Sequence, residues 1–219
     1  MKLALFDLDH TLIPFDSDQA WGNFVCELGW VDAAYHRARN AAFFADYKAG
    51  VLDIHAYLEF ALAPIAAHTE AELAAAHARF MADVVLPQMR PAAQALVDKH
   101  RALGHECVVV TATNEFVTRP IAAQFGISEL LGIQLEQLAG RYTGKPAGVL
   151  SFKEGKLTRV QAWCAARGVA FEACESWFYS DSINDLALLQ AANHPIATNP
   201  DARLLKAAQE HGFEVLHLW

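Results

Sequence analysis

The first ten residues read MKLALFDLDH, from Met1 to His10, and they decide the fold. A short apolar run, Leu3 to Phe6, ends abruptly at the acidic residues Asp7 and Asp9. Continuous apolar runs are typical of parallel strands that helices cover on both faces. In an open sheet of that kind, ligands bind at the carboxyl ends of the strands. The opening therefore predicts a buried strand that delivers two carboxylates to a binding site.

The same pattern returns twice further along the chain. Residues 107–110 form an apolar run that ends in Thr-Ala-Thr-Asn at 111–114, and residues 177–179 precede Ser-Asp-Ser at 180–182. Helical patterns separate the apolar runs, and they cover residues 91–103, 115–125, 157–167, 183–192 and 201–211, with weaker strand candidates at 195–197 and 214–216. This alternation predicts an α/β fold with a Rossmann-like parallel sheet.

One segment, residues 14–87, contains no convincing strand and is rich in Ala, Phe and His. We interpret it as a helical cap domain inserted after the first strand, with breaks between helices at Lys48-Ala49-Gly50 and at Ala63-Pro64. Residues 1–13 and 88–219 then form the α/β core domain. Within that core, residues 132–148 resemble a small hairpin around Ala139-Gly140.

Composition excludes several classes of protein. The chain has 219 residues, of which 54% are hydrophobic and 19% charged, so it is not a disordered chain. The net charge of −8 disfavours nucleic acid as a partner, although a local cation can still hold a small anionic substrate.

No apolar stretch is long enough to span a membrane or to act as a signal peptide. Four scattered cysteines make no disulfide framework, so we expect a cytoplasmic protein. No sequence feature specifies an oligomeric state.

The two acids after the first strand indicate the chemistry. Alternation along an extended chain places Asp7 and Asp9 on one side and turns Leu8 away. Adjacent carboxylates repel each other unless a proton or a cation relieves them. Mg²⁺ prefers oxygen ligands and also binds phosphate. Asp181, at the end of another strand, is a candidate third ligand.

Three motifs in this order resemble those of the haloacid dehalogenase-like (HAD) phosphohydrolases. Residues 7–11, DLDHT, resemble the first motif, and Val109-Val110-Thr111 is similar to the second. Residues 179–185, YSDSIND, resemble the fourth, with Ser180 in place of the usual glycine. A helical insertion directly after the first motif resembles the cap of the phosphoserine-phosphatase-like branch.

The resemblance implies a role for each motif residue. Asp7 is expected to be the nucleophile that forms an aspartyl phosphate, and Asp9 the general acid and base. Thr111 is expected to bind a phosphoryl oxygen. The resemblance implies a Mg²⁺ site formed by Asp7, Asp9 and Asp181, with Asp185 as a further acidic residue near the metal or the lysine.

The third family motif is a lysine that stabilises the phosphoryl oxygens. Lys153 and Lys156 are both candidates in this chain. Lys156 follows Gly155 and opens a predicted helix, and the related branch often shows a Gly-Lys pair at this point. We therefore favour Lys156.

The substrate is expected to be a small phosphorylated metabolite that the cap selects. Asp16 lies nine residues after the nucleophile, where phosphoserine phosphatases place a glutamate, and with Asp18 it is a candidate for binding a substrate ammonium group. At the second strand end, Thr111, Ala112 and Asn114 are further candidates for substrate contacts.

The choice of substrate depends on a missing arginine. Phosphoserine carries a carboxylate, for which the family uses a cap arginine, and the matching stretch, residues 49–55, contains none. A buried carboxylate without a cation is costly. The sequence thus favours a phosphorylated amino alcohol such as histidinol phosphate, with phosphoserine as the alternative. A phosphoryl-transferring mutase, a dehalogenase and a non-enzymatic phospho-acceptor or binding module are rival functions.

Overall fold

The computed structural model describes residues 1–219, which divide into two compact units. The first unit consists of residues 1–15, 88–133 and 149–219, and the second of residues 16–87 and 134–148. The sequence analysis placed residues 134–148 in the core domain, whereas the structure groups them with the helical unit. The reason is packing, because strand β4 (Arg141–Ala147) lies against helix α3 (Ile54–Ala67).

A parallel sheet forms the centre of the first unit. Its strands are β1 (Lys2–Phe6), β2 (Glu106–Asn114), β3 (Glu129–Leu138), β5 (Glu175–Ser180), β6 (His194–Thr198) and β7 (Glu214–Leu216). They lie in the order β3-β2-β1-β5-β6-β7, with every neighbouring pair parallel. β1, the strand with the first acidic motif, is therefore central, between the strands that carry the second and fourth motifs. The α/β, Rossmann-like fold class is confirmed.

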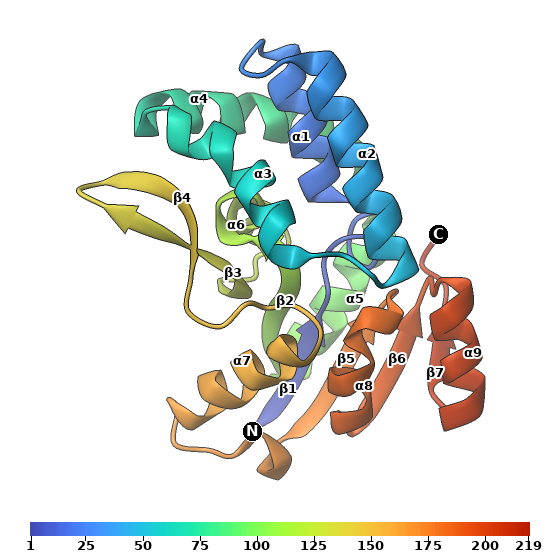
Figure 1. The fold of residues 1–219 in the computed structure, drawn as a ribbon. Helices are drawn as coiled ribbons and strands as arrows, with labels where there is room; N and C mark the ends of the chain where they lie inside the picture. Colours follow the sequence, from blue (N-terminus) through green and yellow to red (C-terminus); the bar gives the residue numbers. More distant parts are fainter. The chain divides into compact units, whose positions relative to one another are not determined.

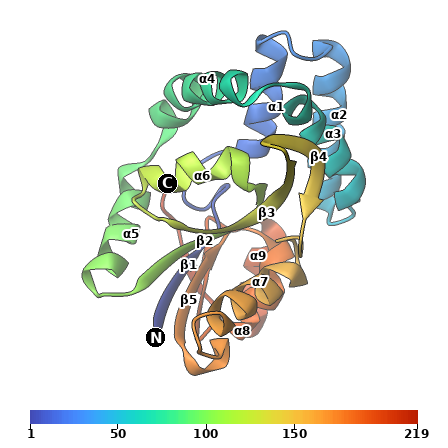
Figure 2. The same cartoon turned by 90° about the vertical axis from the view of Figure 1, so that its left-hand side faces the viewer.

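Helices cover both faces of this sheet. They are α5 (Pro91–Ala102), α6 (Glu115–Gln124), α7 (Glu154–Ala165), α8 (Leu186–Ala191) and α9 (Ala202–His211). Figure 2 shows α5 on one side of the strands and α7 and α8 on the other. The predicted strand at 107–110 proves longer, because β2 continues through Thr111 to Asn114. The helix expected from residue 157 begins at Glu154, so Lys156 lies inside its first turn.

Alternating side chains of the central strands fill the core on both faces. Leu5, Val110 and Phe178 belong to one buried apolar cluster, which also contains Val160 of α7. On β1, Phe6 is fully buried and stacks on Tyr179 of β5, with 5.2 Å between ring centroids. This burial on both faces explains why the strands read as continuous apolar runs.

Four helices form most of the second unit, and Figure 1 shows them in blue to green. They are α1 (Ser17–Glu27), α2 (Ala33–Ala49), α3 (Ile54–Ala67) and α4 (Glu70–Phe80). Each begins at a residue whose side chain accepts a hydrogen bond from the first turn, namely Asp16, Asp32, Asp53 and Thr69. A π-turn at Met81–Val85 and a 3₁₀ turn at Leu86–Gln88 follow α4.

The predicted helix breaks had different outcomes. The break at Lys48-Ala49-Gly50 is confirmed, because α2 ends at Ala49 and is capped by Gly50, whose φ of 77° is left-handed. The break at Ala63-Pro64 is wrong, since α3 continues through Pro64 to Ala67. Because proline has no backbone N–H, the helix lacks only the hydrogen bond that residue 64 would donate to the carbonyl of Phe60. The apolar packing of the buried Leu62 and Ile65 holds the helix together.

The hairpin predicted around Ala139-Gly140 is present. In it, β3 pairs with β4 in antiparallel register. Ala139 and Gly140 both have positive φ, 50° and 77°, which is the backbone of a tight two-residue hairpin turn. Across the chain, no helix combines the length and the apolar character needed to cross a bilayer.

Candidate active site

Asp7 follows the central strand and is almost completely buried, with 5% of its surface exposed. Its backbone N–H donates to the carbonyl of Tyr179, 2.9 Å away, so the chain is still paired with β5 at this residue. The next side chain, Leu8, is fully buried. This pairing holds the Asp7 carboxylate firmly at the carboxyl end of the sheet.

Lys156 brings two of the predicted site residues together. Its Nζ donates to Asp7 Oδ1 at 2.8 Å and to Asp185 Oδ2 at 2.7 Å. The Lys156 side chain is 2% exposed, so both ion pairs are shielded from water. Burial by itself lowers the pKa of Lys156, but the Asp185 and Asp7 carboxylates outweigh burial and raise that pKa above its usual value. Lys156 is therefore a fixed positive charge within the acidic cluster.

Local backbone geometry explains why Lys156, and not Lys153, reaches the cluster. A Cβ added at Gly155 would lie 2.0 Å from the carbonyl oxygen of Leu150, so only glycine permits this close approach. Lys153 precedes α7 with a φ of 51°, and its ammonium lies over the ring of Phe152. The two lysines, three residues apart, thus have different surroundings.

Asp185 is anchored from two sides. Besides Lys156, the hydroxyl of Ser180 donates to Asp185 Oδ2 at 2.7 Å. Ser180 stands where the family usually has glycine, and its Oγ also accepts the Ser182 N–H at 3.1 Å. Ser180 is thus a site residue to which the sequence analysis assigned no role. Burial raises the pKa of Asp185 to about 6, against the lowering effect of Lys156.

Thr11 connects Asp7 with Asp181. Its hydroxyl lies 3.4 Å from Asp7 Oδ2 and 3.3 Å from Asp181 Oδ1, and it accepts the Asp181 N–H at 3.1 Å. Burial, together with the Asp7 and Asp185 carboxylates, raises the pKa of Asp181 well above its usual value. Thr11 lies within the first motif, but its sequence position alone predicted no role, and only the fold shows that it touches both acids.

The donor set of this cluster is suited to a hard cation. The buried carboxylates of Asp7 and Asp185 both pair with the Lys156 ammonium, and the half-buried Asp181 adds a third carboxylate, whose pKa is raised by desolvation first and by Asp7 and Asp185 next. No three His, Cys, Asp or Glu side chains are arranged around one point as metal ligands. Mg²⁺ commonly takes only one or two protein carboxylates and keeps several waters. Of the four predicted ligands, Asp7 and Asp181 share Thr11, whereas Asp185 is bonded to Lys156 and Ser180.

Asp9 is held by the second motif. Its Oδ2 accepts a hydrogen bond from Thr113 Oγ1 at 2.8 Å, across 104 positions of sequence. Thr111 is 1% exposed, and its Oγ1 accepts the Thr113 N–H at 3.1 Å. Thr113 was not predicted as a site residue. Its spacing of two from Thr111 on a strand places both side chains on the same face, which is the signal that was available.

The other two candidates on β2 have different surroundings. Asn114 Oδ1 accepts the Val117 N–H at 3.1 Å, so its side chain caps α6. Ala112 is half-buried on the strand between the two threonines.

Two predicted substrate contacts lie in the second unit. Asp16 begins α1, and its Oδ1 accepts the Gln19 N–H at 2.7 Å. Asp18, which is 8% exposed, accepts a hydrogen bond from the hydroxyl of Tyr57 at 2.7 Å. Tyr57 was not predicted, since nothing in the local sequence links it to a residue 39 positions away. Asp16 thus has a capping partner, and Asp18 a tertiary one.

A family profile, that of the haloacid dehalogenase-like hydrolases, matches residues 4–190. The matched span contains all three strand-end motifs and Lys156. The chain belongs to the haloacid dehalogenase-like hydrolases. The expected enzyme class, a phosphoric monoester hydrolase of this superfamily, is confirmed.

Two curated relatives bear on the substrate. A histidinol-phosphatase of Neisseria meningitidis serogroup C is 47% identical over 218 residues, which cover 99% of this chain and 98% of that protein. The phosphoserine phosphatase SerB1 of Mycobacterium tuberculosis is 28% identical over 215 residues, which cover 97% of this chain and 69% of that protein.

Two solved structures match the fold over the full chain. A protein of unknown function from Bordetella pertussis Tohama I is 46% identical, with a TM-score of 0.94 and coverage of 100% of this chain and 99% of that one. An aspartyl-phosphate analogue complex of phosphoserine phosphatase has a TM-score of 0.70 at 16% identity, with coverage of 100% and 93%, and shares the fold.

Proposed function

We propose that this hydrolase is a Mg²⁺-dependent phosphomonoesterase that works through an aspartyl phosphate and acts on a small phosphorylated metabolite, with histidinol phosphate as the best candidate. One observation carries the mechanism. The Asp7 carboxylate is fixed at the end of the central strand by Lys156 and lies beside Thr11, which also contacts Asp181. An oriented carboxylate beside a fixed cation is suited to attack an anionic phosphoryl group.

In the proposed first half-reaction, an oxygen of Asp7 attacks phosphorus and the bond between phosphorus and the ester oxygen breaks. Asp9 gives its proton to the departing alkoxide, which leaves as the alcohol. The Thr113 hydroxyl, 2.8 Å from Asp9 Oδ2, orients the carboxyl group for this transfer. Lys156 and Thr111 stabilise the phosphoryl oxygens, because a buried cation and a hydroxyl donor favour the charge that develops there.

In the second half-reaction, the aspartyl phosphate is hydrolysed. Asp9, now a carboxylate, takes a proton from water, and the water oxygen attacks phosphorus. The bond between phosphorus and the Asp7 oxygen breaks, which releases inorganic phosphate and restores the Asp7 carboxylate.

The residues that would hold Mg²⁺ are Asp7 and Asp181, with the backbone carbonyl of Asp9. A bound Mg²⁺ would neutralise phosphate charge and the repulsion between these two carboxylates. Asp185 serves as the partner that fixes Lys156, since its carboxylate is bonded to that ammonium and to Ser180.

Substrate identity rests on two observations. The chain matches a histidinol-phosphatase along almost its full length at 47% identity. Residues 49–55 contain no arginine to pair with the carboxylate of phosphoserine. The structure adds Arg141 of β4 to the arginines of the helical unit, and this side chain interacts with Glu72.

The four cysteines are free, which supports the reducing cytoplasm as compartment.

Turnover of histidinol phosphate, phosphoserine and p-nitrophenyl phosphate tests the proposal. We expect the highest kcat/KM with histidinol phosphate. Asp7→Asn should lower turnover at least a hundredfold, given the roughly 10²–10⁴-fold usual for one acid–base group. A higher kcat/KM for phosphoserine than for histidinol phosphate would make phosphoserine the preferred substrate. Release of one phosphate per chain would instead indicate a phospho-acceptor.

Asp18 and Asp16 form a matched pair for the ammonium contact. Asp18→Asn should lower kcat/KM for histidinol phosphate about 10- to 150-fold and leave p-nitrophenyl phosphate unchanged, since a charge-assisted hydrogen bond contributes roughly 1.5–3 kcal/mol. Asp16→Asn changes a helix cap and should affect both substrates alike. Equal losses on both substrates for Asp18→Asn would remove this carboxylate from the substrate contacts.

A further inference from the structure

A groove in the helical unit is lined by none of the residues of the proposed mechanism. It has a volume of about 550 Å³ and is bordered by α2 and α3 and by Trp30 and Val31, which precede α2 in the chain. Most of its lining is aromatic or aliphatic, as in Trp30, Phe60 and Pro64. The volume and the apolar lining are those of a site for a small organic ligand.

The aromatic walls of this groove are held in place by partners. Trp30 stacks on His68 with 3.7 Å between ring centroids, and His68 Nδ1 lies 2.8 Å from the carbonyl oxygen of Pro64. Because that carbonyl only accepts, Nδ1 of His68 is the protonated nitrogen. Phe60, on α3, stacks on His36 of α2 with 4.3 Å between ring centroids. The groove therefore offers preordered flat surfaces to a planar group.

His36 is a polar group of the lining that the fold leaves unsatisfied. It is 5% exposed, and neither ring nitrogen has a hydrogen-bond partner. Burial lowers the pKa of His36, so the ring is neutral at pH 7 and has one donor and one acceptor nitrogen. An unpaired buried polar group is costly, so His36 is a strained point of the groove wall.

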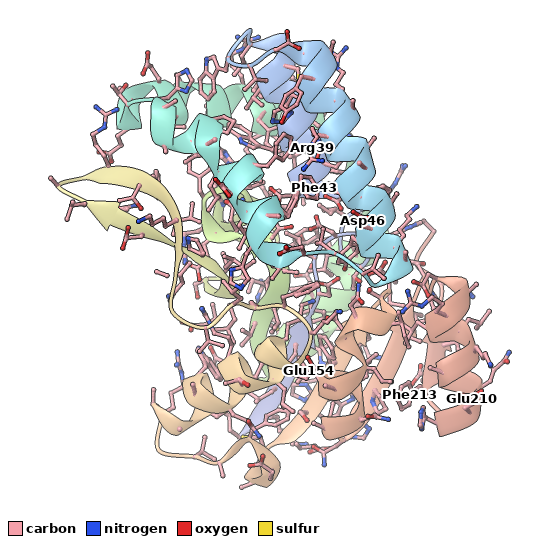
Figure 3. All side chains as sticks on the ribbon, in the orientation of Figure 1. Arg39, Phe43, Asp46, Glu154, Glu210 and Phe213 are labelled. Atoms are coloured by element: carbon pink, nitrogen blue, oxygen red, sulfur yellow. The ribbon has the colours of Figure 1, made fainter.

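Two opposite charges border the same groove. Arg39 of α2 and Glu59 of α3 both line it, and both side chains are exposed. They form no ion pair with each other, and Arg39 lies over the ring of Phe43, one turn further along α2 (Figure 3). Glu59 repels a purely anionic ligand, and Arg39 repels a purely cationic one. A zwitterion satisfies both charges.

We propose that the groove between α2 and α3 binds an α-amino acid with a planar ring side chain. The ring stacks between Trp30 and Phe60, the carboxylate pairs with Arg39 and the ammonium pairs with Glu59. The ligand contacts both helices, α2 and α3, of the helical unit.

Calorimetric titration of the full chain with L-phenylalanine and two analogues tests the proposal. The analogues are 2-phenylethylamine, which lacks the carboxylate, and 3-phenylpropanoate, which lacks the ammonium. We expect saturable binding of L-phenylalanine that Arg39→Met and Glu59→Gln each weaken about 10- to 150-fold, as for loss of one charge-assisted contact. The measurement needs no turnover, so its outcome is separate from that of the proposed function.

The analogues give a crossed pattern that a general loss of structure does not. Arg39→Met should weaken the binding of 3-phenylpropanoate and leave the binding of 2-phenylethylamine unchanged. Glu59→Gln should have the opposite effect on the two analogues. Arg37→Met is the matched control, because Arg37 is an exposed arginine of the same helix that does not line the groove. L-alanine, which has no ring, should bind at least tenfold more weakly than L-phenylalanine.

Three results would overturn the proposal. One is no saturable heat with L-phenylalanine, L-tryptophan or L-histidine. Another is binding that neither Arg39→Met nor Glu59→Gln weakens, which would place the ligand elsewhere on the chain. The third is equal binding of L-alanine and L-phenylalanine, which would remove the role of the aromatic walls.

Discussion

Lys156 Nζ donates a hydrogen bond to Asp7 Oδ1 across 2.8 Å, although the two residues are 149 positions apart in the chain. Both side chains are buried, with exposed fractions of 2% and 7%. A buried ion pair costs desolvation of both groups, so it is weak evidence for stability by itself. Its use here is orientation, because it fixes the carboxylate that we propose as nucleophile.

Replacing Lys156 should affect both stability and turnover. Lys156→Met leaves Asp7 and Asp185 buried without their cation, so we expect the free energy of unfolding to fall by about 3–5 kcal/mol. Urea denaturation measures this change, and turnover should fall at least a hundredfold. Lys153→Met is the control and should retain both. Loss of activity in Lys153→Met with retention in Lys156→Met would reverse the assignment.

Thr113 should act through Asp9. Thr113→Val removes the donor 2.8 Å from Asp9 Oδ2. A hydrogen bond to a charged group contributes roughly 1.5–3 kcal/mol, which predicts a kcat about 10- to 150-fold lower with little change in KM. Thr113→Ser keeps the hydroxyl and should recover most of the rate. If the serine variant is as slow as the valine variant, the hydroxyl does not position Asp9.

Removal of the metal should abolish turnover. The proposed ligands of Asp7, Asp9 and Asp181 are hard oxygen atoms, so EDTA should abolish turnover and Mg²⁺ should restore it. Ca²⁺ should not restore it, because its longer bonds misplace the phosphate. A second readout is thermal: Mg²⁺ should raise the Tm of the wild type and leave that of Asp181→Asn unchanged. Full activity after exhaustive chelation would contradict the magnesium proposal.

His100 should make stability depend on pH. Its Nε2 lies 2.8 Å from the Tyr179 hydroxyl and its Nδ1 lies 2.8 Å from His105 Nδ1. Burial, with smaller effects of His105 and Lys99, lowers the pKa of His100 from 6.5 to about 4. Between these values the unfolded chain binds more protons, so stability is complete above pH 6.5 and falls as the pH drops toward 4.

Urea denaturation at pH 7.5 and pH 5 measures this dependence. The linkage of about 1.4 kcal/mol for each unit of pKa shift limits the total loss from His100 to about 3.5 kcal/mol, of which about 2 kcal/mol is expected by pH 5. His100→Gln should show a smaller difference between the two pH values than the wild type. His55→Gln, at an exposed position of α3, is the control and should match the wild type. Equal pH dependence in all three proteins would exclude His100 as the cause.

Much of the sheet and several site residues follow from local sequence. The apolar run before Asp7 predicts β1 because a buried parallel strand needs apolar side chains on both faces. Two further runs with polar ends predict β2 and β5, and the carboxyl ends of parallel strands share one edge of a sheet. For this reason the sequence alone could predict four site residues, each within three positions of its strand's apolar run: Asp7, Asp9, Thr111 and Asp181.

Other features depend on contacts between distant segments. Tyr57 bonds to Asp18, Thr113 to Asp9 and Thr11 to Asp181, and in each pair at least 39 positions separate the two residues. No local pattern encodes such a pair, because its geometry is set when whole strands and helices pack.

The sequence by itself determined the parallel sheet, the acids at its strand ends and the helical character of residues 14–87, because hydrophobic periodicity and strand-end polarity are local properties of a chain. Only the tertiary structure decided that α3 continues through Pro64 and that residues 134–148 join the helical unit. It also decided that Lys156 stands between Asp7 and Asp185. The physical reason is that packing across the chain outweighs local propensity and selects among conformations that the local sequence leaves open.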